Sequence, residues 1–170
     1  NQLCFGRPLK GRLADRFYEG HEKIAADKNF SARRVDKKNL DKYAVDFATV
    51  YNKAFAGHEG NKQMDVKVAK KLFQTMKPVM DEDIVWFAYY KDEPISMYIN
   101  LPELNQIFKH LNGRFGLWAK LKFIWFKSKR ICTRVTGIVF GVIPAYQGMG
   151  VDYFTIVEAA KIIQHKTNYI

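Results

Sequence analysis

One segment constrains the fold of this 170-residue chain more than any other: an apolar run that passes through a glycine-rich loop into a helical pattern. Residues 131–143 (ICTRVTGIVFGVI) are rich in β-branched side chains and predict a long strand. Residues 144–150 contain one proline and two glycines and predict a loop. Residues 152–166 predict a helix, because their apolar side chains recur at helical spacing. The order of strand, loop and helix predicts a mixed α/β (α+β) fold.

The rest of the chain supplies further elements for such a sheet. Helices are predicted over residues 14–27, 40–55, 65–77, 103–111 and 117–127, and strands over residues 31–36, 84–90 and 95–101. The last two strands form a hairpin across the turn at residues 91–94, and Asn39 and Asp65 are expected to cap the helices that follow them. We expect one domain over residues 31–170, with a helical insertion at about 103–130. Residues 1–30 are expected to form an arm or the tail of a preceding domain.

The positive charge of the chain is concentrated in one block. The net charge is +11, and residues 104–151 hold eight Lys or Arg residues and no acid. Such a block favours an anionic partner, namely a phosphorylated cofactor, a nucleic acid or a membrane surface. Lysines that are simply solvated on an exposed helix are the alternative. The chain has no recognised nucleic-acid-binding module, so we expect no nucleic-acid partner.

Cysteine, histidine and hydropathy patterns indicate a reduced cytoplasmic protein without a metal. Cys4 and Cys132 belong to no metal-ligand pattern and read as free thiols, with a disulfide between them as the alternative. The four histidines have no zinc-ligand spacing, so no metal site is expected. The longest uncharged run, residues 135–151, is interrupted by a proline and four glycines and is not a membrane span.

The glycine-rich loop has the properties of an anion-binding site. Glycines allow backbone amides to approach a ligand closely, and the first N–H groups of a helix have no partner within the helix. The helix dipole adds about half a positive charge at the same end. A strand that enters a helix through such a loop therefore predicts a phosphate or pyrophosphate cradle, although a plain tight turn has the same pattern.

The residues of this loop, Val142-x-Pro144-x-Tyr146 followed by Gln147-Gly148-Met149-Gly150-Val151, resemble the pyrophosphate loop of the GCN5-related N-acetyltransferase (GNAT) superfamily. The order of predicted elements over residues 31–170 is similar to that family too, and residues 101–105 resemble a subgroup of GNAT-like proteins of unassigned substrate that are longer than this chain. The resemblance implies an acyl-CoA-dependent N-acyltransferase, with acetyl-CoA as cosubstrate and a small-molecule amine or a peptide as acceptor. It implies that the CoA pyrophosphate binds the backbone amides of Gln147, Gly148, Met149, Gly150, Val151 and Asp152. It further implies that the pantetheine arm pairs with backbone groups near Gly141 and Val142.

Three departures from the family pattern favour an alternative function. Asp152 stands where the motif has Gly or Ala, and its carboxylate would repel a pyrophosphate. The predicted strand 131–143 contains no acid that could deprotonate an amine. The last strand and helix of the family would lie beyond Ile170, so the chain is expected to be a fragment. The alternative is a degenerate GNAT-like domain that senses acyl-CoA or binds a partner. No catalytic residue is assigned.

A second alternative rests on residues 116–130 (GLWAKLKFIWFKSKR). Their aromatic and aliphatic side chains fall on one helical face and lysines surround the rest. This pattern is typical of a helix that lies on an anionic membrane surface, and a peripheral membrane-binding module is the function it predicts. A helix that covers a sheet, with its lysine stems lying along the apolar surface, has the same pattern.

Overall fold

The structure, a computed structural model, describes residues 8–56, 63–103, 133–165 and 169. Four strands form one antiparallel sheet in the order β1 (Phe30–Arg34), β2 (Val85–Tyr90), β3 (Glu93–Pro102) and β4 (Val135–Val142). The helices are α1 (Asp15–Ala25), α2 (Leu40–Ala54), α3 (Val66–Met76) and α6 (Val151–Ile163). Two 3-10 turns, η1 (Glu82–Ile84) and η2 (Pro144–Tyr146), precede β2 and α6. The mixed α/β class expected from the sequence is confirmed.

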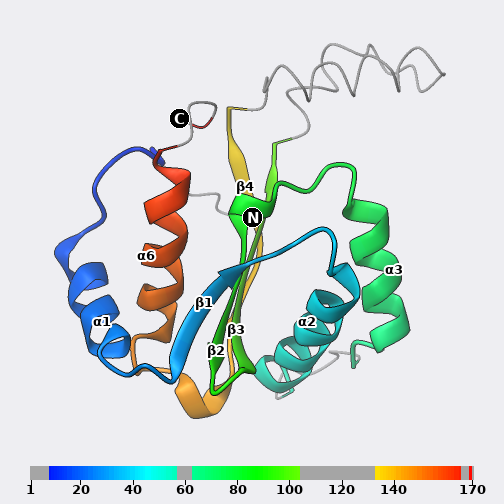
Figure 1. The fold of residues 1–170 in the computed structure, drawn as a ribbon, viewed down its shortest axis with the longest axis horizontal. Coiled ribbons are helices and arrows are strands. Elements are labelled where there is room, and N and C mark those ends of the chain that lie inside the picture. The colour runs from blue at the N-terminus through cyan, green and yellow to red at the C-terminus, as the bar shows by residue number, and fades with distance from the viewer. Residues whose placement is uncertain (1–7, 57–62, 104–132, 166–168, 170) are drawn as a thin grey trace, which may run out of the picture.

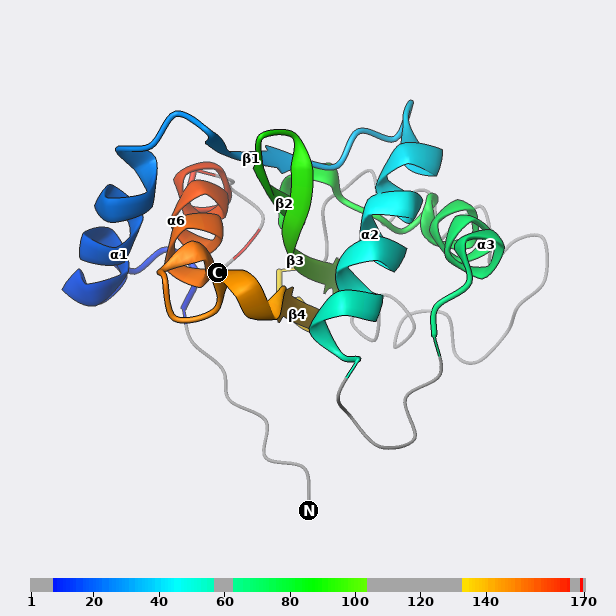
Figure 2. The same ribbon diagram turned by 90° about the horizontal axis from the view of Figure 1, so that it is seen from below.

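The helices cover both faces of the sheet. Figures 1 and 2 show α1 and α6 on one side and α2 and α3 on the other, which makes three layers. The central strand β2 is apolar throughout and almost completely buried, as a strand covered on both faces must be. The α2 face contributes Tyr43 and Phe47 to the core, and α6 contributes Val151 and Phe154. The core therefore lies on both sides of β2 and β3.

The predicted hairpin is confirmed as β2 and β3. Its turn residues Lys91 and Asp92 have φ angles of 46° and 65°, which allow a tight reversal. The strand predicted over residues 31–36 is observed as β1, which begins one residue earlier and ends two residues earlier. The strand predicted over residues 131–143 is observed as β4 from Val135 onward, and β4 stands at one edge of the described sheet. The predicted helices 103–111 and 117–127, like Cys4 and Cys132, lie outside the described residues, except for residue 103.

The two predicted caps have different outcomes. The Asp65 carboxylate accepts hydrogen bonds from the amides of Lys67 (2.7 Å) and Val68 (3.3 Å), as an N-cap should. Asn39 occupies the predicted N-cap position of α2, but its side chain makes no capping hydrogen bond. Its amide donates instead to Asp36 Oδ2 at 2.7 Å. The carboxylate that precedes Asn39 thus engages the side chain that would otherwise cap α2.

The N-terminal helix is packed against the sheet layers. Within α1, Gly20 and Ile24 are buried, and α1 lies along α6 in both views (Figures 1 and 2). His21 Nε2 lies 2.7 Å from Glu158 Oε1, and the His21 ring stacks on Phe154. Residues 15–25, which the sequence placed in an arm, therefore form part of the layer that contains α6.

Candidate functional site

The loop between β4 and α6 is shaped by one 3-10 turn and two glycines. After η2, Gly148 and Gly150 have φ angles of 74° and 99°, a region that strains every residue with a side chain. Gly150 is the N-cap of α6 and supplies no side chain to that helix end. The two glycines therefore determine how the chain passes from the edge strand into the helix.

The first amides of α6 have no hydrogen-bond partner among the described residues. Within the described part of the chain, the backbone N–H groups of Val151, Asp152 and Tyr153 make no hydrogen bond. The first closed bond of the helix runs from the Phe154 amide to the Gly150 carbonyl at 2.9 Å. Unpaired donors at the positive end of a helix dipole attract anions. This local geometry is the one that the sequence predicted for the loop.

A pocket of about 300 Å³ opens where this loop meets the end of β4 and the end of α2. Its lining residues are Ala54, Phe55, Phe140, Gly141, Val142, Tyr146, Gln147, Gly148 and Asp152. Five of the eight predicted site residues therefore line one pocket. A side chain added at Gly148 would meet no atom within 4 Å, so the backbone there is open to approach.

The other three predicted residues do not line the pocket. The Met149 side chain is exposed, Gly150 is buried, and the Val151 side chain is completely buried in the core. The resemblance assigned all three residues to the ligand through their backbone amides, without regard to their side chains. In the folded loop their backbone atoms belong to the same turn, but their side-chain positions point to solvent, to α1 and to the core.

The Gln147 side chain has a role that the sequence did not reveal. Its Nε2 donates a hydrogen bond of 2.9 Å to the carbonyl oxygen of Val142. This bond closes the loop on the last residue of β4 and fixes the pocket wall. The backbone amide of Gln147, which the resemblance assigned to the pyrophosphate, donates to the Pro144 carbonyl at 3.2 Å and is therefore already engaged within the loop.

Helix α1 packs against the loop at Gly150 and against the first turn of α6. A side chain at Gly150 would lie 3.1 Å from the Gly20 carbonyl oxygen. A side chain at Gly20 would lie 2.2 Å from the Tyr153 ring, so α1 approaches α6 closely only because residue 20 is glycine. The position of the loop thus depends on a helix that the sequence assigned to an arm.

Asp152 lies in the first turn of α6 and lines the pocket while partly buried. An acid in the first helical turn is stabilised by the helix dipole. Asp152 also lines the space that an anion would occupy in this pocket, and like charges repel. The repulsion that the sequence predicted at this position therefore has a geometric basis.

Four residues of the pocket were missed by the sequence analysis. Ala54 and Phe55 come from α2, Phe140 from β4 and Tyr146 from η2. The Tyr146 ring packs against Tyr90 with ring centroids 5.7 Å apart. Tyr146 could have been predicted as a pocket residue, because it belongs to the Val142-x-Pro144-x-Tyr146 pattern in the sequence. The end of α2 gave no such signal, because its position beside β4 is a tertiary property.

The described residues contain no cluster of three or more His, Cys, Asp or Glu that could hold a metal ion. Strand β4 (VTGIVFGV) contains no carboxylate. Glu103 Oε2 accepts a hydrogen bond from Thr136 Oγ1 at 2.9 Å, beside the start of β4, whereas the pocket lies at its end. Among the described residues that line the pocket, Asp152 is the one carboxylate, and no residue is assigned as a general base.

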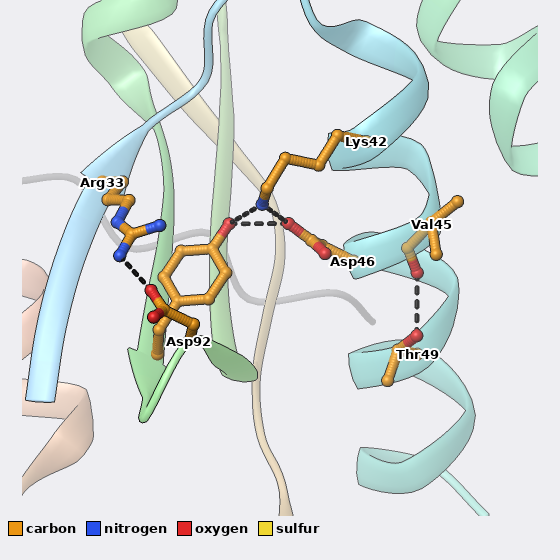
Figure 3. A network of polar contacts seen from close by, with 7 residues as sticks. Arg33, Lys42, Val45, Asp46, Thr49 and Asp92 are labelled. Carbon is orange, nitrogen blue, oxygen red and sulfur yellow. Dashed lines mark hydrogen bonds and ion pairs between the residues drawn. The ribbon is translucent and has the colours of Figure 1, made fainter. Parts of the chain in front are cut away.

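A second polar cluster connects α2 with the centre of the sheet (Figure 3). The Tyr89 hydroxyl donates to Asp46 Oδ2 at 2.6 Å, and Lys42 Nζ lies 2.5 Å from the same oxygen and 3.1 Å from the hydroxyl. Burial, together with the hydrogen bond to Asp46, raises the pKa of Tyr89 far above its usual value. The cluster lines neither the 300 Å³ pocket nor a larger groove beside α6, so we interpret it as structural.

The fold is a mixed α/β domain in which a glycine-containing loop joins the edge strand β4 to α6. No protein-family model matches the chain. A protein named bacterial ceramide synthase, from Caulobacter vibrioides (strain NA1000 / CB15N), is 27% identical to it over 92 residues. The match covers 52% of this chain and 24% of that relative's own length. None of the described helices has the length and apolar character needed to cross a membrane.

Proposed function

We propose that the chain is a GNAT-like domain of an acyl-CoA-dependent N-acyltransferase. The observation that supports this most is the 300 Å³ pocket, in which the open loop at Gly148 and Asp152 in the first turn of α6 meet the end of β4. The partial similarity to a protein named ceramide synthase gives independent support, since a ceramide is by chemical definition an amide of a long-chain amino alcohol. The amine acceptor of this chain stays open.

The residues present fit the pyrophosphate of CoA. The pocket is open at Gly148, where no atom would contact an added side chain, and the donors at the start of α6 have no protein partner among the described residues. Bound acyl-CoA would supply a thioester whose acyl carbon forms a bond to the amine nitrogen as its bond to sulfur breaks. Gly141 and Val142 line the same pocket and would direct the pantetheine arm along β4.

The contribution of the chain is orientation and electrostatics. Holding two reactants in the correct geometry replaces a large entropic cost. The backbone amides would neutralise the pyrophosphate, and Gln147 would keep the loop closed on Val142. The amine must lose a proton during the reaction, and we assign no residue to that step.

Binding of CoA tests the proposal. Titration calorimetry of CoA into the full chain should give saturable binding, and CoA should raise the melting temperature. Asp152→Asn should strengthen binding by roughly fivefold at low salt, as about 1 kcal/mol of repulsion is removed, and this gain should shrink at high salt. Met149→Ala, in the same loop but outside the pocket, is the matched control. No binding of CoA at millimolar concentration would refute the proposal.

A non-catalytic acyl-CoA-binding domain is the second candidate. The absence of a carboxylate from β4 and the presence of Asp152 in the pocket favour it. The two candidates differ in turnover, since both predict that CoA binds. Release of free thiol from acyl-CoA in the presence of a panel of amines would support the enzyme, and binding without any thiol release would support the second candidate.

A further inference from the structure

A second and larger cavity lies on the α6 face of the sheet. This groove has a volume of about 730 Å³, within the range of about 300–1,000 Å³ that is usual for small-molecule sites. Apolar side chains enclose it from three directions: Leu9 and Leu13 from the N-terminal segment, Tyr98 and Val135 from the sheet, and Ile156 and Ala160 from α6. An apolar ligand that entered it would be removed from water on several sides.

Three residues with hydrogen-bonding side chains line the groove besides Tyr98, namely Asn100, Arg134 and Gln164, and each of them already has an interaction within the protein. The Asn100 amide donates to the Ile84 carbonyl at 2.8 Å, and the Gln164 amide donates to the Gly11 carbonyl at 2.9 Å. Both donors are therefore used within the protein. The groove presents mainly hydrocarbon surface, which suits an alkyl chain better than a polar molecule.

One aromatic pair contributes a residue to the groove and a residue to the 300 Å³ pocket. Tyr98 lines the groove and Phe140 lines the pocket. These residues are cross-strand partners on β3 and β4, and their rings meet edge to face with centroids 5.6 Å apart. A ligand whose charged end lies at the loop and which follows β4 toward its beginning would pass this pair and reach the groove.

Strand β4 is irregular where it borders the groove. Ile99 pairs with Val139, but Asn100 pairs with Gly137, so Ile138 is an extra residue and is 55% exposed. Such bulges often lie beside active sites. Gly137 lines the groove without a side chain, and glycine within a strand often marks the close approach of a ligand.

We propose that this groove binds the acyl chain of a long-chain acyl-CoA. The donor of the proposed reaction is then a fatty acyl thioester rather than acetyl-CoA. The inference rests on the proposed function, because it requires the thioester to extend from a pyrophosphate held at the loop. Its own support is the apolar lining, the volume, the Tyr98–Phe140 connection and the glycine at the bulge.

The test is a series of acyl-CoAs of increasing chain length, titrated below their micelle concentrations into the full chain. Acetyl-, butyryl-, octanoyl-, lauroyl- and palmitoyl-CoA should bind with affinities that rise by up to about fourfold per buried methylene. The rise should end when the groove is full. Free CoA gives the reference affinity for the loop alone.

Two variants test whether the acyl chain of the ligand lies in the groove. Gly137→Leu would fill part of the groove, since a Cβ at this position would make only an ordinary contact of 3.5 Å with Asn100 Oδ1. Ala160→Leu would fill the groove from α6. Both should lower the affinity for palmitoyl-CoA at least tenfold and leave the affinity for CoA unchanged. Val68→Leu, on the exposed surface of α3, should change neither. Melting temperatures without ligand check that each variant is folded.

The outcomes separate this inference from the proposed function. Equal affinities for acetyl- and palmitoyl-CoA, with CoA itself bound, would overturn the inference and leave the proposed function standing. If the affinity of both groove variants still rises with acyl-chain length as in the parent, the inference is also overturned, since the acyl chain would then bind elsewhere. If no CoA compound binds, the proposed function fails and the inference fails with it.

Discussion

Replacing Tyr89 by Phe should destabilise the protein at neutral pH. The substitution keeps the buried ring and removes the hydroxyl that donates to Asp46 Oδ2 at 2.6 Å. A hydrogen bond to a charged group contributes about 1.5–3 kcal/mol, and Lys42 continues to pair with Asp46 in the variant. For a chain of this size we expect the melting temperature to fall by roughly 3–12 °C.

The difference in free energy of unfolding between the parent and Tyr89→Phe should become smaller at alkaline pH. Because the pKa of Tyr89 is raised in the folded state, the folded protein keeps its proton above pH 10, whereas the unfolded chain releases it. The stability due to Tyr89 is therefore fully present below about pH 10 and is lost at about 1.4 kcal/mol per pH unit above it. Tyr89→Phe lacks this loss, so the difference between the two proteins should shrink by about 2 kcal/mol near pH 11.5.

Urea unfolding followed by circular dichroism at pH 7, 9, 10.5 and 11.5 would measure both effects. Tyr43→Phe is the matched control, since burial also raises the pKa of Tyr43 but no hydrogen bond from its hydroxyl occurs among the described residues. That variant should lose little stability at pH 7. A constant difference between the parent and Tyr89→Phe across this pH range would refute the reasoning.

Three further predictions concern single positions. Gly150→Ala should lower the melting temperature more than Gly148→Ala, because both have positive φ but only residue 150 would approach the Gly20 carbonyl; equal losses would contradict this. Gly20→Ala should be strongly destabilising, since its side chain would lie 2.2 Å from the Tyr153 ring, and Tyr153→Ala should restore much of the loss in the double variant. Ser96→Ala should raise the free energy of unfolding by about 1 kcal/mol in denaturant titrations, because the buried hydroxyl has no partner among the described residues; a loss of stability would show that it has one.

Local patterns predicted the elements of this fold but not their contacts. The hairpin, α2, α3 and α6 follow from periodicity and turn residues, which depend on neighbours in sequence. The role of α1 was missed because Gly20 lowers its helix propensity, while the fold uses that glycine for close packing on Tyr153. The Asn39 side chain makes no capping hydrogen bond because Asp36 competes for it.

In the candidate site, too, the local features could be predicted from the sequence and the tertiary contacts could not. Backbone properties of the loop, namely its glycines and the start of α6, could be predicted from the motif. The walls formed by Ala54 and Phe55 could not, since they depend on where α2 ends relative to β4. The bulge at Ile138 was also hidden, because its cause is the pairing of two strands that lie far apart in the chain.

The packing of α1 on α6 has a consequence for how the chain is made. His21 and Glu158 are 137 residues apart, so the contact that supports the loop is among the most non-local in the fold. At a synthesis rate of about 5–20 residues per second, α1 leaves the ribosome roughly 7–27 s before its partner exists. During that interval Ile24 and Phe17 have no α6 to pack against. The pocket is therefore assembled late in biogenesis, after the nascent α1 has exposed these apolar side chains for several seconds.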